Sequence, residues 1–180
     1  CARARSAPPS FPSWIPVPPP TPSVVLCPNR GSRGHPHLCR RHCVHVATGV
    51  GCPHGDECDY CHMPHTNSGS CFDKETRAML QEMPRLHYLE LMRKVLETSM
   101  QDSSLVGKEG LLSALDDEIR SASEEATSHR CERRRPAELR RLRRRMTKAM
   151  NVAAVVSFAA RRCSSDGAAT LMQMVEQMRG

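Results

Sequence analysis

Four residues in the first third of the chain have the types and the spacing of a metal site. Cys43, Cys52, Cys58 and His62 follow one another in the pattern C-x8-C-x5-C-x3-H. Three thiolates and one imidazole complete the tetrahedral ligand set of a structural Zn²⁺ ion. A set closed by four protein ligands leaves no position open for a reacting water molecule. We therefore expect one Zn²⁺ ion here, with a structural and not a catalytic role.

The residues between these ligands suit a chain that folds tightly around an ion. Gly55 lies in the short segment between Cys52 and Cys58, where glycine can adopt a positive φ without a Cβ clash. Tyr60 lies two residues before His62, where its ring can pack on the ligands or stack on a base. Because the segment has no apolar core of its own, zinc binding would supply most of its folding free energy, about 10 kcal/mol or more at neutral pH.

The segment 51–62 has the pattern G-C-x-x-G-D-x-C-x-Y-x-H and resembles the CCCH (C3H1-type) zinc-finger family. The resemblance covers residues 36–65. Members of that family usually bind single-stranded RNA, with backbone groups that contact base edges and aromatic side chains that stack between bases. The resemblance implies that Tyr60 is the stacking ring. The family often has a second aromatic residue two positions after the first cysteine, where this chain has His45.

The cysteines admit two other uses. The ten cysteines could form disulfides in a secreted protein, but the start of the chain lacks the apolar run of a signal peptide. The second is an all-cysteine metal site of the ribbon type, with Cys39, Cys43, Cys58 and Cys61 as ligands. That choice would leave Cys52 and His62 without a role. Cys39 and Cys61 could also serve as extra or exchanging ligands of the first site.

Charge is distributed unevenly along the chain, which has a net charge of +7. The segment from Cys39 to His65 contains two arginines and three acidic residues, whereas residues 130–162 contain twelve basic and two acidic residues. Phosphate contacts dominate the affinity of most nucleic-acid complexes. If RNA binds, we expect phosphate contacts from arginines near the finger and in the basic block: Arg30, Arg33, Arg40, Arg41, Arg140, Arg141, Arg143, Arg144 and Arg145.

Five segments follow from composition and pattern. Residues 1–35 are Pro-rich and predict a disordered arm, because proline excludes helices and central strands. The finger spans 36–65, a helical region 71–129, an Arg-rich amphipathic helix 130–162 and a short C-terminal helix 163–180. The expected fold class, with the finger as the resemblance implies it, is a small zinc-stabilised irregular CCCH finger, a mainly α-helical C-terminal region and a disordered Pro-rich N-terminal arm. Aromatic residues make up only 3% of the chain, which predicts a small core.

Apolar spacing and helix caps place the helices. Asp73 is the expected N-cap of a helix over 74–81. Apolar stripes with spacings of three and four residues predict helices over 85–100 and 109–125. Pro136 suits the first position of a basic helix running to about Ala160, and Asp166 is the expected cap of the last helix. We interpret the stripes mainly as the core of a small bundle, with a partner-binding groove as the alternative.

The basic helix admits four interpretations. It could be a solvated helix lying on the bundle, a nuclear-import sequence, a phosphate-binding surface, or a membrane-surface or calmodulin-type element. The apolar run 152–160 is too short to cross a bilayer, which needs about 20 residues, so no transmembrane segment is expected.

These observations favour a binding protein over an enzyme. The sequence contains no P-loop, no GxGxxG and no nucleophile elbow. We expect single-stranded RNA binding through the finger, with phosphate contacts from arginines. The alternative is a protein-interaction adaptor, in which the zinc finger is a structural staple and the helices or the Pro-rich arm recruit partners. The location is expected to be nuclear or cytoplasmic, and the basic block favours the nucleus.

Overall fold

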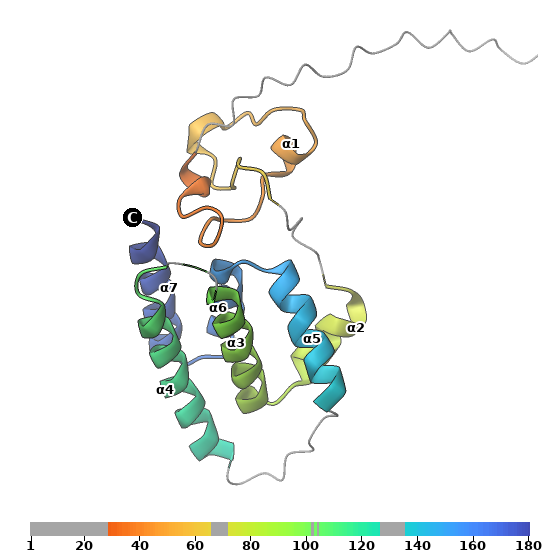
Figure 1. Ribbon diagram of the computed structural model, residues 1–180, viewed down its shortest axis with the longest axis vertical. Helices are drawn as coiled ribbons and strands as arrows, with labels where there is room; N and C mark the ends of the chain where they lie inside the picture. Colours follow the sequence, from red (N-terminus) through yellow and green to blue (C-terminus); the bar gives the residue numbers. More distant parts are fainter. Residues whose placement is uncertain (1–28, 66–71, 102, 104, 127–135) are drawn as a thin grey trace, which may run out of the picture.

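The computed structural model describes residues 29–65, 72–101, 103, 105–126 and 136–180. Residues 29–65 form an irregular segment, here called the finger segment, which sits on one end of a bundle of helices (Figure 1). The Pro-rich arm predicted for residues 1–35 lies outside the described residues up to residue 28. Residues 29–35, however, belong to the folded finger segment, in which Asn29 and Ser32 are buried. The predicted boundary at residue 36 was therefore wrong by about seven residues.

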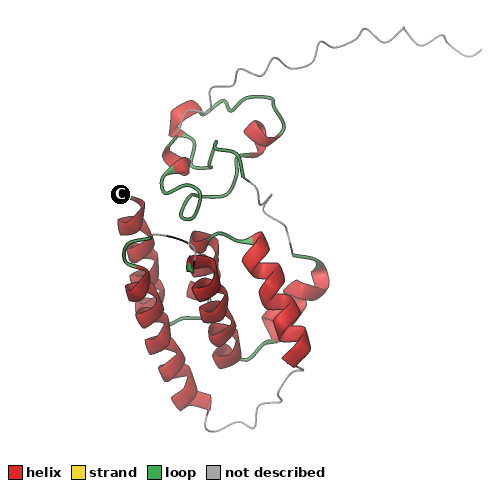
Figure 2. Ribbon diagram, viewed as in Figure 1, coloured by secondary structure: helices red, strands yellow, loops and turns green. Residues whose placement is uncertain are grey.

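The finger segment consists of loops and three short helical turns (Figure 2): η1 (Arg30–Ser32), α1 (Val44–Ala47) and η2 (Gly55–Glu57). Within the described residues no strand forms, and the one β-bridge pairs His42 with Cys61 in parallel. Loops dominate because glycines and closely spaced cysteines leave little room for regular structure. Gly49, Gly51 and Gly55 all have positive φ and bend the chain at three successive places.

The bundle contains six helices among the described residues: α2 (Lys74–Glu82), α3 (Arg85–Met100), α4 (Lys108–Ala126), α5 (Pro136–Ala149), α6 (Val152–Ala160) and α7 (Ser165–Arg179). Helix α3 packs against α4, α5 and α6, and α7 packs against α4 and α6. Asp73 caps α2 as predicted, because its side chain accepts a hydrogen bond from the Thr76 amide at 2.7 Å. The mainly helical prediction is confirmed for the described part of the chain.

The predicted apolar stripes form one core. Leu89, Met92 and Leu96 of α3 are at most 1% exposed, and they pack in the same cluster as Leu111 and Leu115 of α4. Further members come from α5, α6 and α7, including Met146, Val155 and Leu171. The core is therefore more extensive than the low aromatic content predicted. Leucine, valine and methionine supply the buried surface that aromatic residues would otherwise provide.

The prediction of one basic helix from Pro136 to about Ala160 was wrong, because α5 ends at Ala149 and α6 begins at Val152. The Asn151 side chain accepts a hydrogen bond from the Ala154 amide at 2.9 Å and caps a new helix. A similar correction applies to the last helix, where Ser164 replaces Asp166 as the cap by accepting from the Gly167 amide at 3.0 Å. Among the described helices, none is both long and apolar enough for a membrane span.

The finger segment is joined to the bundle by hydrogen bonds to three of its backbone carbonyls and by one buried apolar side chain. Leu38 is 1% exposed and belongs to the same apolar cluster as the bundle core. The Leu38 carbonyl accepts from Arg179 Nε at 2.7 Å, the His37 carbonyl from the Ala153 amide at 3.3 Å, and the Cys39 carbonyl from Asn151 Nδ2 at 3.0 Å. The start of α6 and the end of α7 therefore hold the segment 37–39 in place.

Candidate metal centre

The four predicted ligands converge on one point. One donor atom from each of Cys43, Cys52, Cys58 and His62 lies within 4.8 Å of every other. The Cys43 and Cys58 sulfurs are 4.0 Å apart, close to the separation of about 3.8 Å between two thiolates on a tetrahedral Zn²⁺ and about twice a disulfide bond. His62 Nε2 is buried and has no hydrogen-bond partner in the described part of the chain. A buried, unpaired ring nitrogen beside three sulfurs fits a metal ligand.

Local backbone geometry positions these thiols. Cys43 is the N-cap residue of α1, and although burial opposes ionisation, the amides of Val46 and His45 lower the pKa of its thiol. Burial raises the pKa of Cys58 to about 11, partly offset by the Tyr60 amide, which lies 3.4 Å from the sulfur. The Cys58 thiol therefore resists ionisation on its own, whereas a bound cation deprotonates a coordinating thiol outright. The chemistry of this group therefore suits a soft divalent cation.

A second group lies beside the first and was not predicted. His35, Cys39, Cys61 and His65 also place one donor atom each within 4.8 Å of one another. The distance from Cys39 Sγ to His65 Nε2 is 3.7 Å, and that from Cys61 Sγ to His35 Nδ1 is 3.5 Å. Both cysteines are buried, at 1% and 0% exposure. The finger segment thus contains two Cys/His groups that could each hold a metal ion, and not the single site expected.

The two groups interleave along the chain. Cys61 and His62 are consecutive but belong to different groups. Cys61 lies in the bridge with His42, its amide donating to the Arg41 carbonyl at 2.8 Å and its carbonyl accepting from the Cys43 amide at 2.9 Å. Neighbouring side chains of extended backbone point to opposite sides. The bridge therefore directs Cys61 into one group and His62 into the other.

This arrangement decides between the earlier alternatives for the cysteines. The all-cysteine site is contradicted, because Cys39 and Cys61 lie in one group while Cys43 and Cys58 lie in the other. The six cysteines of the described part of the chain are all free, so no disulfide forms among them. The prediction that Cys39 and Cys61 serve the first site as extra or exchanging ligands did not include His35 and His65, with which the structure groups them.

The predicted stacking ring, Tyr60, is 53% exposed while its backbone is tightly held. Asn29 Nδ2 donates to the carbonyls of Cys58 and Tyr60, at 2.6 and 2.7 Å. Gly31 packs directly on this loop, since a Cβ atom at Gly31 would lie 2.4 Å from the Tyr60 carbonyl carbon. A fixed backbone with an exposed ring is the arrangement that a stacking platform needs. His45, the second candidate, is also exposed.

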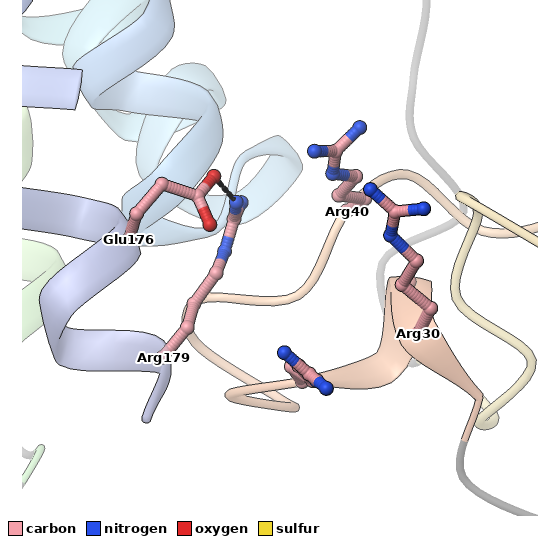
Figure 3. A pocket seen from close by; sticks show the side chains of 6 residues that line it. Arg30, Arg40, Glu176 and Arg179 are labelled. Carbon is pink, nitrogen blue, oxygen red and sulfur yellow. Dashed lines mark hydrogen bonds and ion pairs between the residues drawn. The ribbon is translucent and has the colours of Figure 1, made fainter. Parts of the chain in front are cut away.

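Arginines gather beside this loop and form a basic pocket, here called the arginine pocket (Figure 3), lined by Arg30, Gly31, Arg33, Arg40, Glu176 and Arg179. The guanidinium groups of Arg30 and Arg40 lie next to each other, and both approach Asp59, at 3.4 and 3.8 Å. Arg179 reaches the pocket from the end of α7 and pairs with Glu176. The contribution of α7 was not predicted, because the 139-residue separation between positions 40 and 179 carries no pattern.

The predicted arginines of the basic block lie on α5, on the other side of α3 and α6 from α7 (Figure 1). Arg145 is engaged within the bundle: it donates to Asp73 at 2.7 Å and to Thr76 at 3.2 Å, and it lowers the pKa of the Asp73 carboxyl. Four other predicted arginines are exposed or half-buried: Arg140, Arg141, Arg143 and Arg144. Arg41 is exposed on the finger segment and does not line the arginine pocket. The structure therefore places the candidate phosphate contacts in two separate regions.

Comparison with known proteins adds no relative. No protein-family model matches the sequence, no curated protein is significantly similar to it, and no solved structure has a significantly similar fold.

Proposed function

We propose that the chain is a CCCH-type zinc-finger protein that binds single-stranded RNA. In this proposal Cys43, Cys52, Cys58 and His62 hold a structural Zn²⁺ ion. The ion fixes the loop that carries Tyr60, whose ring stacks on a base. The observation that carries the proposal is that the loop with this exposed ring packs on the arginine pocket: Gly31 of the pocket meets the Tyr60 backbone, and Arg30 and Arg40 approach Asp59.

The loop that carries Tyr60 meets the arginine pocket at the neighbouring residue, Asp59. Asp59 precedes Tyr60 and is the residue that both Arg30 and Arg40 approach. Both arginine side chains are about half exposed or more, at 67% and 48%. Exposed ion pairs of this kind contribute little to stability, so these arginines can exchange Asp59 for a phosphate at small cost. A strand could therefore place a base on Tyr60 and a neighbouring phosphate at the arginine pocket.

The finger segment also exposes apolar side chains that a binding partner such as RNA could cover. Five large apolar side chains are exposed in the described part of the chain, and three of them, Val44, Val50 and Tyr60, belong to this segment. The apolar stripes of the helices, in contrast, are mostly buried in the common core. This burial weakens the adaptor alternative, in which helical faces recruit proteins. The arginines of α5 would add a second, less specific phosphate contact, and their basic block suits a nuclear location.

Quantitative RNA binding tests the proposal. The zinc-loaded full chain would be titrated with a pool of randomised single-stranded RNA and with duplex RNA of the same length. Stacking contributes about 1–3 kcal/mol per base, so Tyr60→Ala is expected to weaken single-strand binding about 5- to 150-fold. Tyr60→Phe keeps the ring and is expected to stay within about threefold of the wild type.

Matched controls separate the finger from general charge effects. Arg120 is exposed on α4, far along the chain from the finger segment, and pairs with Asp117. Arg120→Gln removes the same charge as Arg40→Gln and should leave affinity nearly unchanged, whereas Arg40→Gln should weaken it. Equal effects of the two arginine variants, together with an unchanged Tyr60→Ala, would refute RNA recognition by the finger. Binding would then be attributed to diffuse charge, and the adaptor function would become the better explanation.

A further inference from the structure

The second Cys/His group of the finger segment has the donor set of a metal site. His35, Cys39, Cys61 and His65 supply two sulfurs and two ring nitrogens, a combination typical of structural Zn²⁺. Two thiolates and two imidazoles favour Zn²⁺ over hard cations such as Mg²⁺ and Ca²⁺, which prefer oxygen ligands.

The distances match a tetrahedral centre. Bond lengths of about 2.3 Å for Zn–S and about 2.05 Å for Zn–N place a sulfur and a nitrogen on the same ion about 3.6 Å apart. The two measured sulfur–nitrogen distances, 3.7 Å for Cys39 and His65 and 3.5 Å for Cys61 and His35, bracket this value. Two separate Cys–His hydrogen bonds would also explain the sulfur–nitrogen distance within each pair. They would not require all four donor atoms to lie within 4.8 Å of one another, as they do.

The surroundings of this group also resemble those of a ligand sphere. Asn151 Nδ2 lies 3.6 Å from Cys39 Sγ while donating to the Cys39 carbonyl, and Ser32 Oγ lies 3.3 Å from Cys61 Sγ. The rings of His35 and His65 meet edge to face, with centroids 5.1 Å apart. Polar groups that touch the ligands orient them and are a regular part of protein metal sites.

From this geometry we propose that His35, Cys39, Cys61 and His65 bind a second Zn²⁺ ion, so that the finger segment is a two-zinc module. The second ion would lie on the side of the finger segment that faces the bundle, because Cys39 is the ligand that Asn151 of the α6 cap holds. It would therefore tie together the turn after η1, at His35, the segment 37–39 and the end of the finger segment at His65. Neither the RNA-binding proposal nor the first ion depends on it.

Counting the metal ions tests the inference directly. Native mass spectrometry and elemental analysis of the purified full chain are expected to give two Zn²⁺ ions per molecule. Cys39→Ala and His65→Ala should each retain one ion, and so should Cys52→Ala, which removes a ligand of the first group. Cys163→Ala and His54→Ala serve as controls from outside both groups, and both should retain two.

A cobalt titration keeps the test decisive if a ligand variant fails to fold. In the wild-type chain, the tetrahedral Co²⁺ absorption should rise until two equivalents are bound, with sulfur-to-metal bands from five thiolates. Saturation at one equivalent would overturn the inference. So would a second ion that survives in Cys39→Ala and His65→Ala but is lost in Cys71→Ala or Cys27→Ala, because those cysteines belong to neither group.

Discussion

Gly31 offers the sharpest test of how the finger segment is built. A methyl group at this position would lie 2.4 Å from the carbonyl carbon of Tyr60 and 2.5 Å from the carbonyl carbon and oxygen of Asp59. These are backbone atoms, so no side chain can rotate away. To restore ordinary van der Waals contact, the two segments must separate by about 1 Å. In Gly31→Ala, the turn η1 would therefore be pushed off the loop that carries Tyr60.

The cost follows from the hydrogen bonds that such a shift breaks. The Gly31 amide donates to the Cys58 carbonyl at 3.0 Å, and Asn29 Nδ2 donates to the same carbonyl at 2.6 Å. Lengthening these contacts by about 1 Å removes both, and each buried group left unsatisfied costs about 1–3 kcal/mol. For the two hydrogen bonds we expect a total of about 2–6 kcal/mol. Because folding of such a segment is coupled to metal binding, the apparent zinc affinity should fall about 30- to 25,000-fold.

Competition with a chromophoric chelator measures this change in affinity. Gly110→Ala is the matched control: its new methyl group meets only the flexible Met174 Cε at 3.4 Å, and it lies in α4, where alanine favours the helix by about 1 kcal/mol. That variant should keep wild-type zinc affinity. If Gly31→Ala bound zinc within threefold of the wild type, the close approach of η1 to the Tyr60 loop would not hold the metal site together, and the reasoning would be refuted.

Three further predictions concern charge, pH and the junction with the bundle. The double variant Arg30→Gln, Arg40→Gln should make the slope of log affinity for single-stranded RNA against log salt less negative by about 1.4, since each phosphate contact contributes about −0.7. An unchanged slope would exclude the arginine pocket as a phosphate site. The buried Glu118 accepts hydrogen bonds from Arg85 and from the Ser164 amide and hydroxyl. Burial would raise the pKa of its carboxyl, but these partners outweigh that effect and lower it. Its contribution to stability should therefore be complete above its ordinary pKa of about 4.3 and be lost as the pH falls further. Chemical denaturation should show this loss, and Glu118→Gln should flatten it and cost about 1–3 kcal/mol at pH 7. Asn151→Asp keeps the cap of α6 but removes the donor to Cys39, so metal release from the second group should accelerate about 10- to 100-fold while the helical circular dichroism is unchanged; release at the wild-type rate would show that this contact does not support the site.

The sequence predicted those features that depend on local pattern. The cap at Asp73 predicted a helix over 74–81, and apolar spacing predicted helices over 85–100 and 109–125; the structure has them at Lys74–Glu82, Arg85–Met100 and Lys108–Ala126. The convergence of the first four ligands follows from a spacing that permits little else. The break between α5 and α6 was missed because Met150 and Ala153 continue the apolar stripe of the preceding helix, and both are buried. That periodicity outweighed the weaker signal of a capping asparagine between them.

The second Cys/His group was missed for a different physical reason. Its ligands lie before, between and after those of the first group along the chain, and His35 lies in a stretch that composition had assigned to the Pro-rich arm. A sequence motif for one metal site names the ligands of that site and counts every residue between them as a spacer. The cysteines and histidines of a second, interleaved site are then overlooked. Only the pairing of His42 with Cys61 shows that consecutive residues face two different sites.

This interleaving has a mechanical consequence. The Cys61–His62 dipeptide contributes one ligand to each group, so neither group can form fully without fixing the backbone of the other. The entropy cost of ordering this short segment is therefore paid once for two sites. The His62 amide donates hydrogen bonds to the side chains of the buried Asn29 and Ser32, at 3.2 and 3.0 Å. The dipeptide is therefore also tied to the turn η1. Occupying either group should thus order the lead-in turn, the Tyr60 loop and the arginine pocket together. The two groups would in this way couple metal binding to the surface proposed to bind RNA, although no residue of either group lines the arginine pocket.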